Sequence, residues 1–158
     1  MLFRSCSTVY INTKQYAKAE QLLEALIDEY PENFQLKNNL AWLYATAEDS
    51  AFRDAQKAIE LAQEAMILAP NVHNVWSTLA EAYYSAGQYE KANRAIIHMI
   101  SLVRRYGSDM PQPMIDSYKA QMRKYKRALD TEKVLQPDEE DGSLELLSVD
   151  DDAQEQQD

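Results

Sequence analysis

The sequence predicts an all-α protein, because its composition favours helices and a helical pattern recurs along it. Of its 158 residues only three are glycine and five are proline, whereas 46% are hydrophobic. Alanine, leucine, glutamate, lysine and glutamine are abundant, and these residues favour helix over a turn-rich sheet. A chain of this length and hydrophobic content can bury the core of one domain.

A stretch of sequence recurs at a regular distance, which is typical of repeat architectures. Residues 12–19 read NTKQYAKA and residues 85–92 read SAGQYEKA, sharing Gln-Tyr-x-Lys-Ala. Residues 53–58, RDAQKA, form a middle copy without the tyrosine. The helices before these segments align as Phe3-x₂-Cys6-Ser7-x₂-Tyr10, Lys37-x₂-Leu40-Ala41-x₂-Tyr44 and Trp76-x₂-Leu79-Ala80-x₂-Tyr83, and the helices after them align on Ala19, Ala58 and Ala92.

The spacing of the copies reveals an insertion in the second repeat. First-helix positions 6, 40 and 79 are 34 and 39 residues apart, whereas second-helix positions 19, 58 and 92 are 39 and 34 apart. Five extra residues therefore lie between Tyr44 and Ala58, in the loop joining the two helices. We expect Asp49, Ser50 or Asp54 to cap the second helix, since short oxygen-bearing side chains satisfy its free N–H groups.

These repeats resemble the tetratricopeptide repeat, a 34-residue helix pair with the patterns W-x₂-L-G-x₂-Y and A-x₃-F…P. The resemblance covers residues 1–106 and implies a right-handed superhelical solenoid of three helix pairs, at about 1–33, 34–72 and 73–106. Small residues recur where the paired helices must approach within about 8–10 Å. Pro31 and Pro70 end two of the second helices, and the third ends near Arg104 without a proline.

The chain after the repeats divides into three parts. Residues 107–113 contain glycine and prolines and predict a linker. Residues 114–133 predict an amphipathic helix that caps the last repeat. Its apolar face is Ile115, Tyr118, Met122, Tyr125 and Leu129, and its outer face is Lys119, Arg123, Lys124, Lys126 and Arg127. Residues 134–158 predict a disordered acidic tail.

Charge is concentrated in the tail. Residues 137–158 hold ten of the 26 acidic residues and no lysine or arginine, so residues 1–136 carry 16 acidic and 16 basic residues. A body without net charge argues against nucleic-acid binding. One short apolar stretch interrupts the acidic tail and consists of Leu144, Leu146, Leu147 and Val149. The tail is either a solubilising segment or a motif that docks on a partner or on the basic helix.

No constellation for catalysis, metal binding or cofactor binding is visible, so we expect no enzyme activity, metal or cofactor. His73 and His98 lack partners at ligand spacing, and Cys6 occupies a core position of the repeat. One cysteine cannot form an internal disulfide, which favours a reduced, cytoplasmic setting. No run of about 18 apolar residues occurs, so we expect no membrane insertion and no signal peptide.

The family resemblance implies that the first helices line a concave groove that binds other proteins. The helix positions left free by the packing pattern are Arg4, Thr8, Asn38, Asn39, Trp42, Asn74, Ser77, Glu81 and Tyr84. Asparagines can bond a peptide backbone, and Trp42 is either a binding anchor or a packing residue. Some family members grip a terminal carboxylate with several basic groove residues. This chain departs from that pattern, because only Arg4 is basic and Glu81 would repel the ligand.

The sequence therefore predicts an adaptor or scaffold that binds a peptide or helix of a partner protein. A chaperone for secreted subunits is an alternative of the same class. A third possibility is a C-terminal fragment or structural module of a longer repeat protein, since the first repeat starts near Met1 without a cap. Its uncapped face would then favour self-association. A catalytic domain would require a polar cluster in the groove.

The register of the repeats makes a first prediction. Ala92→Leu places a large side chain where two helices cross, so overpacking should cost about 1–3 kcal/mol of folding free energy. Thermal unfolding measures the loss. An unchanged melting temperature would contradict the register.

Overall fold

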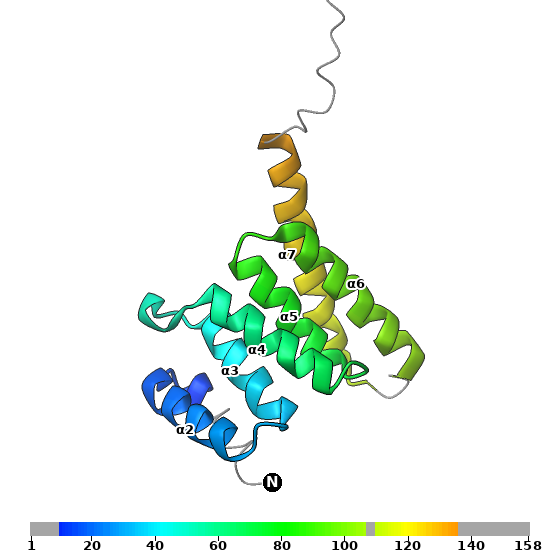
Figure 1. Ribbon diagram of the computed structural model, residues 1–158. Helices are drawn as coiled ribbons and strands as arrows, with labels where there is room; N and C mark the ends of the chain where they lie inside the picture. The colour runs from blue at the N-terminus through cyan, green and yellow to red at the C-terminus, as the bar shows by residue number, and fades with distance from the viewer. Residues whose placement is uncertain (1–9, 107–109, 136–158) are drawn as a thin grey trace, which may run out of the picture.

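The structure, a computed structural model, describes residues 10–106 and 110–135 (Figure 1). Every regular element within these residues is a helix. Residues 10–12 are helical and precede the labelled elements. These elements are α2 (Tyr16–Glu29), α3 (Phe34–Thr46), the 3₁₀ helix η1 (Ser50–Phe52), α4 (Ala55–Leu68), α5 (His73–Ser85), α6 (Tyr89–Tyr106) and α7 (Gln112–Leu135).

The helices form two layers. The pairs α3–α4 and α5–α6 pack along their length, and α3 also packs directly on α5. The second helices of the pairs, α2, α4 and α6, have no comparable contact with one another. Contacts continue from helix to helix along the chain, so the first helices form an inner layer and the second helices an outer one (Figure 1). The predicted all-α repeat solenoid is confirmed, while the acidic tail lies outside the described residues.

Alanines lie where the paired helices meet. Ala19, Ala41, Ala58, Ala80 and Ala92 each have 0% of their surface exposed. These are the small-residue positions of the aligned repeats; the equivalent Ser7 lies outside the described residues. A larger side chain at such a crossing would have to push the helices apart, because the interior has no spare volume.

The insertion in the second repeat forms its own short structure. α3 ends at Thr46, and the chain turns through η1 before α4 begins at Ala55. Of the three predicted caps, Asp54 caps α4 by accepting the N–H of Lys57 at 3.0 Å. Asp49 instead caps η1. The ring of Phe52 packs 5.7 Å from that of Tyr16, which attaches the insertion to α2.

The turn between the helices of a repeat has the same backbone geometry in the first and third copies. Lys14 and Gly87, which are equivalent in the aligned segments, both have positive φ angles, 58° and 73°. The same hydrogen bond closes each turn, from Gln15 N to Tyr10 O at 2.8 Å and from Gln88 N to Tyr83 O at 2.9 Å. Glycine adopts this conformation freely, whereas a side chain makes it costly.

α7 is longer than the range 114–133 that the sequence predicted, because it begins at Gln112 and ends at Leu135. Pro113 fits in its first turn, where no intrahelical N–H partner is needed. Tyr125 is fully buried on the predicted apolar face, and the other members of that face are partly buried. The C-terminal part of α7 extends beyond the repeats (Figure 1).

Three side-chain contacts show that α7 runs parallel to α5. His73 meets Tyr118, Ser77 meets Gln121, and Glu81 meets Tyr125. Residue numbers rise together on both helices, as they do for the first helices of successive repeats. α7 therefore has the direction of a first helix of a further pair, although its backbone lies farther from α5 than that of α3 does.

Within the described ranges, no helix combines the length and hydrophobicity needed to cross a bilayer.

The equivalent turns give a matched pair of substitutions. Gly87→Ala should destabilise the fold by about 1 kcal/mol, because alanine makes the positive φ costly. Lys14→Gly should stabilise the fold by less than that, because it relieves the same backbone cost but also removes the exposed ion pair of Lys14 with Glu48. A Cβ at position 87 would meet no atom within 4 Å, so steric clash does not contribute. Chemical denaturation measures both free energies. Equal stabilities of the two variants and the wild type would contradict the shared turn.

The contact of α5 with α7 should depend on pH. Burial lowers the pKa of His73, and its Nδ1 lies 2.8 Å from the Tyr118 hydroxyl, which can donate to the neutral ring. Because the unfolded chain then protonates first, this stability is present above about pH 6.5 and is lost as pH falls through the folded pKa.

Thermal melts between pH 7.5 and 5 test this contact. His73→Gln should remove part of the acid-induced loss of melting temperature, whereas His98→Gln on α6 should retain it. Identical pH profiles for His73→Gln and the wild type would show that this histidine does not couple α7 to pH.

Candidate functional site

The predicted groove residues lie on the two first helices that form the inner layer. α3 carries Asn38, Asn39 and Trp42, and α5 carries the remaining described members, Asn74, Ser77, Glu81 and Tyr84. Arg4 and Thr8 lie outside the described residues. Because α3 packs directly on α5, the two sets lie on neighbouring helices of the inner layer.

α7 covers the α5 part of this surface. Ser77 and Glu81 are only 6% and 7% exposed. The Ser77 hydroxyl donates to Gln121 Oε1 at 2.8 Å. Tyr84 packs its ring 5.3 Å from the ring of Tyr125. These α5 residues hold α7 in place, so a ligand can reach the buried Ser77 and Glu81 only if α7 moves.

Glu81 is the centre of the polar contact between α5 and α7. Tyr125 donates its hydroxyl to Glu81 Oε2 at 2.5 Å, and Lys124 Nζ lies 2.5 Å from Oε1. Burial, followed by the charge of Glu81, raises the pKa of Tyr125. Lys124 also lies 4.0 Å from the centre of the Tyr84 ring. The sequence placed Lys124 on the outer face of its helix, but the buried carboxylate draws it towards α5.

The α3 part of the surface and the start of α5 each contain an unpaired acceptor. Asn38 is 8% exposed, and its Oδ1 is buried without a hydrogen-bond partner. Oδ1 of Asn74 at the start of α5 is buried and unpaired in the same way. A buried acceptor without a donor costs about 1–3 kcal/mol. Trp42 is partly buried and lies outside the apolar clusters of the described residues.

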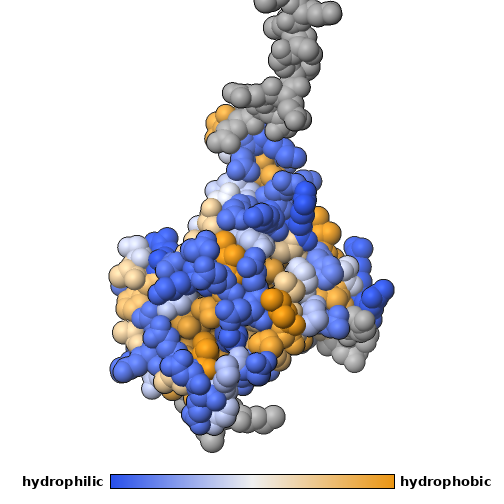
Figure 2. Space-filling model, in the orientation of Figure 1, coloured by the Kyte–Doolittle hydropathy of each residue, from blue (hydrophilic) through white to orange (hydrophobic). Residues whose placement is uncertain are grey.

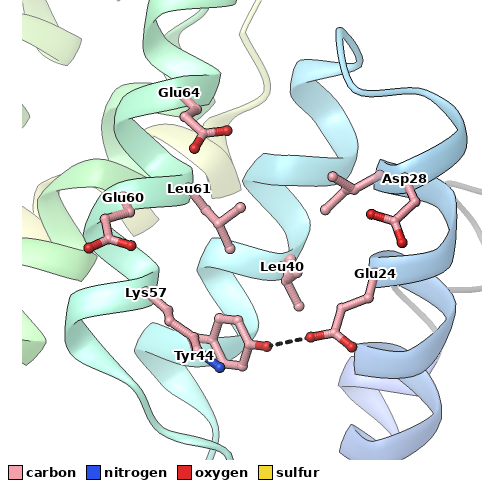
Figure 3. Close-up of a pocket in the computed structure, with 9 residues that line it drawn as sticks. Glu24, Asp28, Leu40, Tyr44, Lys57, Glu60, Leu61 and Glu64 are labelled. Atoms are coloured by element: carbon pink, nitrogen blue, oxygen red, sulfur yellow. Dashed lines mark hydrogen bonds between the residues drawn. The ribbon is translucent and has the colours of Figure 1, made fainter.

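A hollow lies on the outer layer, between α2 and α4 (Figure 3). It has a volume of about 410 Å³. Carboxylates of Glu24 and Asp28 stand on the α2 side, and those of Glu60 and Glu64 on the α4 side. Its remaining lining is Ile27, Leu40, Tyr44, Lys57 and Leu61. Hydrophobic surface is visible between α2 and α4, bordered by hydrophilic residues (Figure 2).

Tyr44 at the floor of this acidic hollow is held as a neutral phenol. Its hydroxyl lies 2.9 Å from Glu20 Oε1 and 3.2 Å from Glu24 Oε1. Burial raises the pKa of Tyr44, and the neighbouring carboxylates raise it further. The phenol is therefore not an activated nucleophile. Glu64 is ion-paired with Lys37 and Lys57 also lines the hollow, so Glu24, Asp28 and Glu60 are the lining carboxylates that attract basic side chains and repel phosphate groups.

Sequence reasoning missed this hollow, although a signal for its walls was present. Glu20, Glu24 and Asp28 recur every four residues on one helix, and Glu60 and Glu64 do so on another. Such spacing places carboxylates in a row on one helix face. That two rows face each other depends on how successive repeats stack.

The histidines have structural neighbours. His73 contacts Tyr118 of α7, and the ring of His98 lies 4.1 Å from that of Trp76. Within residues 10–106 and 110–135, no cluster of three or more His, Cys, Asp or Glu side chains has the arrangement of a metal site. Cys6 lies outside these ranges.

Comparison with known proteins agrees with this architecture. Residues 50–101 match the family model described as tetratricopeptide repeat. The first TPR domain of human RPAP3 superposes with a TM-score of 0.67 at 16% identity, over 84% of this chain and 94% of that one. The TPR domain of Sgt2 from Aspergillus fumigatus superposes with a TM-score of 0.63 at 24% identity, over 85% and 80%. No curated protein shows significant sequence similarity.

Tetratricopeptide repeats are typically non-catalytic modules for protein interaction, and the matches concern both the sequence of the central repeats and the shape of the whole described chain. Residues 50–101 therefore match the tetratricopeptide-repeat family, and the described residues have the fold of tetratricopeptide-repeat domains.

Proposed function

We propose that the chain is a non-enzymatic adaptor that binds an extended segment of a partner protein along α3 and the start of α5. The buried, unpaired oxygens of Asn38 and Asn74 carry this proposal. A backbone N–H of an extended peptide is the donor that such oxygens lack. Because both oxygens are buried, the two amide groups have to turn outwards on binding, and pairing them then recovers the cost of their burial.

Trp42 belongs to the same helix and supplies the aromatic contact. It lies four residues after Asn38, one helical turn further along α3, so both side chains fall on one helix face. Aromatic anchors beside backbone hydrogen bonds are common in interface hot spots. The partner segment would therefore place an apolar side chain near Trp42 and its backbone near the asparagines.

The contacts of α7 define the end of this surface. Glu81, which the sequence placed in the groove, is ion-paired with Lys124 and accepts a hydrogen bond from Tyr125, and so serves the fold more directly than the ligand. A partner segment on α3 need not displace α7. An adaptor of this kind is compatible with a module of a longer repeat protein, and a chaperone for secreted subunits would use the same surface.

Substitutions at these positions should weaken partner binding without lowering the stability of the fold. Asn38→Ala and Asn74→Ala remove unpaired buried oxygens, so the melting temperature should stay the same or rise. Adding Trp42→Ala should weaken capture of a partner by more than tenfold, because such anchors contribute about 2 kcal/mol or more. Quantitative affinity capture from the native cell, with mass spectrometry, compares this triple variant with the full wild-type chain.

The matched control is Asn71→Ala with Gln63→Ala, at exposed positions outside the α3 surface. The control should recover the wild-type partners. If the folded triple variant recovers the same proteins as the wild type, the α3 surface does not bind them and a purely structural module is favoured.

A further inference from the structure

A largely apolar hollow lies between α6 and α7, away from the α3 surface. It has a volume of about 270 Å³ and is more enclosed than the acidic hollow. We name it the α6–α7 cleft. Its lining is Met99, Ile100, Val103 and Arg104 from α6 and Ile115, Tyr118, Lys119 and Met122 from α7.

The charges at the rim of the cleft have one sign. Arg104 and Lys119 are the charged members of its lining, both are basic, and both are exposed. Neither has a carboxylate among the ion pairs of the described residues. An apolar floor between two cations fits a segment that combines large aliphatic side chains with acids.

We propose that the α6–α7 cleft binds the chain's own segment 143–150, SLELLSVD. This segment carries three leucines and a valine, and acidic residues flank it at 138–141 and 150–152. It contains no lysine or arginine. Leucines enter the cleft, while the flanking carboxylates meet Arg104 and Lys119.

The length of the intervening chain permits this contact. Residues 122–135 rise about 20 Å along α7 away from the cleft. Residues 136–143 can span at most about 27 Å when extended, so the segment can return to Met122. Tethering gives it an effective concentration in the millimolar range, so even a weak site is occupied.

The methionines of the cleft provide a direct measurement in the full chain. Met99 and Met122 line the cleft, whereas Met66 lies on α4 outside it. In ¹³C-methyl-methionine NMR spectra, Leu144→Ser/Leu146→Ser/Leu147→Ser should shift the signals of Met99 and Met122 and leave Met66 unchanged. The control Gln154→Ser/Gln156→Ser/Gln157→Ser, further along the tail, should leave all three signals unchanged.

Charge reversal tests the rim independently of the leucines. Arg104→Glu with Lys119→Glu should weaken tail binding at least tenfold. The NMR signal of Met122 should then move towards the position that it has in the leucine variant. High salt should act in the same direction, because the contacts are exposed. Both substituted side chains are exposed, and melting curves confirm that the variant folds.

Two results would overturn the proposal. One is the absence of any shift at Met99 and Met122 in the leucine variant. The other is a wild-type signal position that changes on dilution, which would assign the cleft to a second copy rather than to the same chain. Because the α3 surface is not involved, partner capture through Asn38 and Trp42 is tested separately.

Discussion

Close contact between paired helices is the constraint on which the rest of the structure depends. Five alanines with no exposed surface lie at these crossings, on both helices of the pairs. Within this arrangement the first helices of successive pairs, α3 and α5, touch each other. The second helices of successive pairs have no comparable contact. The inner surface on α3 and α5 and the acidic hollow between α2 and α4 both result from this asymmetry.

The end of the solenoid depends on polar as well as apolar contacts. Tyr125 fills the apolar space, and its hydroxyl shares the Glu81 carboxylate with Lys124. A buried carboxylate without such partners would be costly, and removing one partner of a buried pair generally costs several kcal/mol. Glu81 therefore fixes the register of α7 on α5, which in turn forms the α6–α7 cleft and determines which part of the inner surface stays open.

The surfaces of the chain differ in chemistry, which separates the partners that they suit. The α3 surface offers unpaired acceptors and an aromatic ring, the hollow between α2 and α4 offers carboxylates, and the cleft beside α7 offers apolar side chains between cations. By chemistry alone, a backbone donor, a basic side chain and an acidic leucine-rich segment would be the complements of these three surfaces. A neutral repeat body with an acidic tail is consistent with contacts that are selected locally rather than by a long-range field.

The sequence by itself determined the repeat fold, because hydrophobic periodicity and the crossing residues are local properties. The positions of Ala41, Ala58 and Ala80 and the insertion after Tyr44 could be predicted from spacing, whereas the sequence left Asp49, Ser50 and Asp54 open as caps and the structure selected Asp54 for α4. The tertiary structure alone decided that Glu81 and Ser77 lie beneath α7, that Lys124 turns towards α5, and that two rows of carboxylates face each other. Those outcomes depend on how successive helix pairs stack. The pattern of charges along the sequence cannot show which neighbouring helix will cover a given side chain.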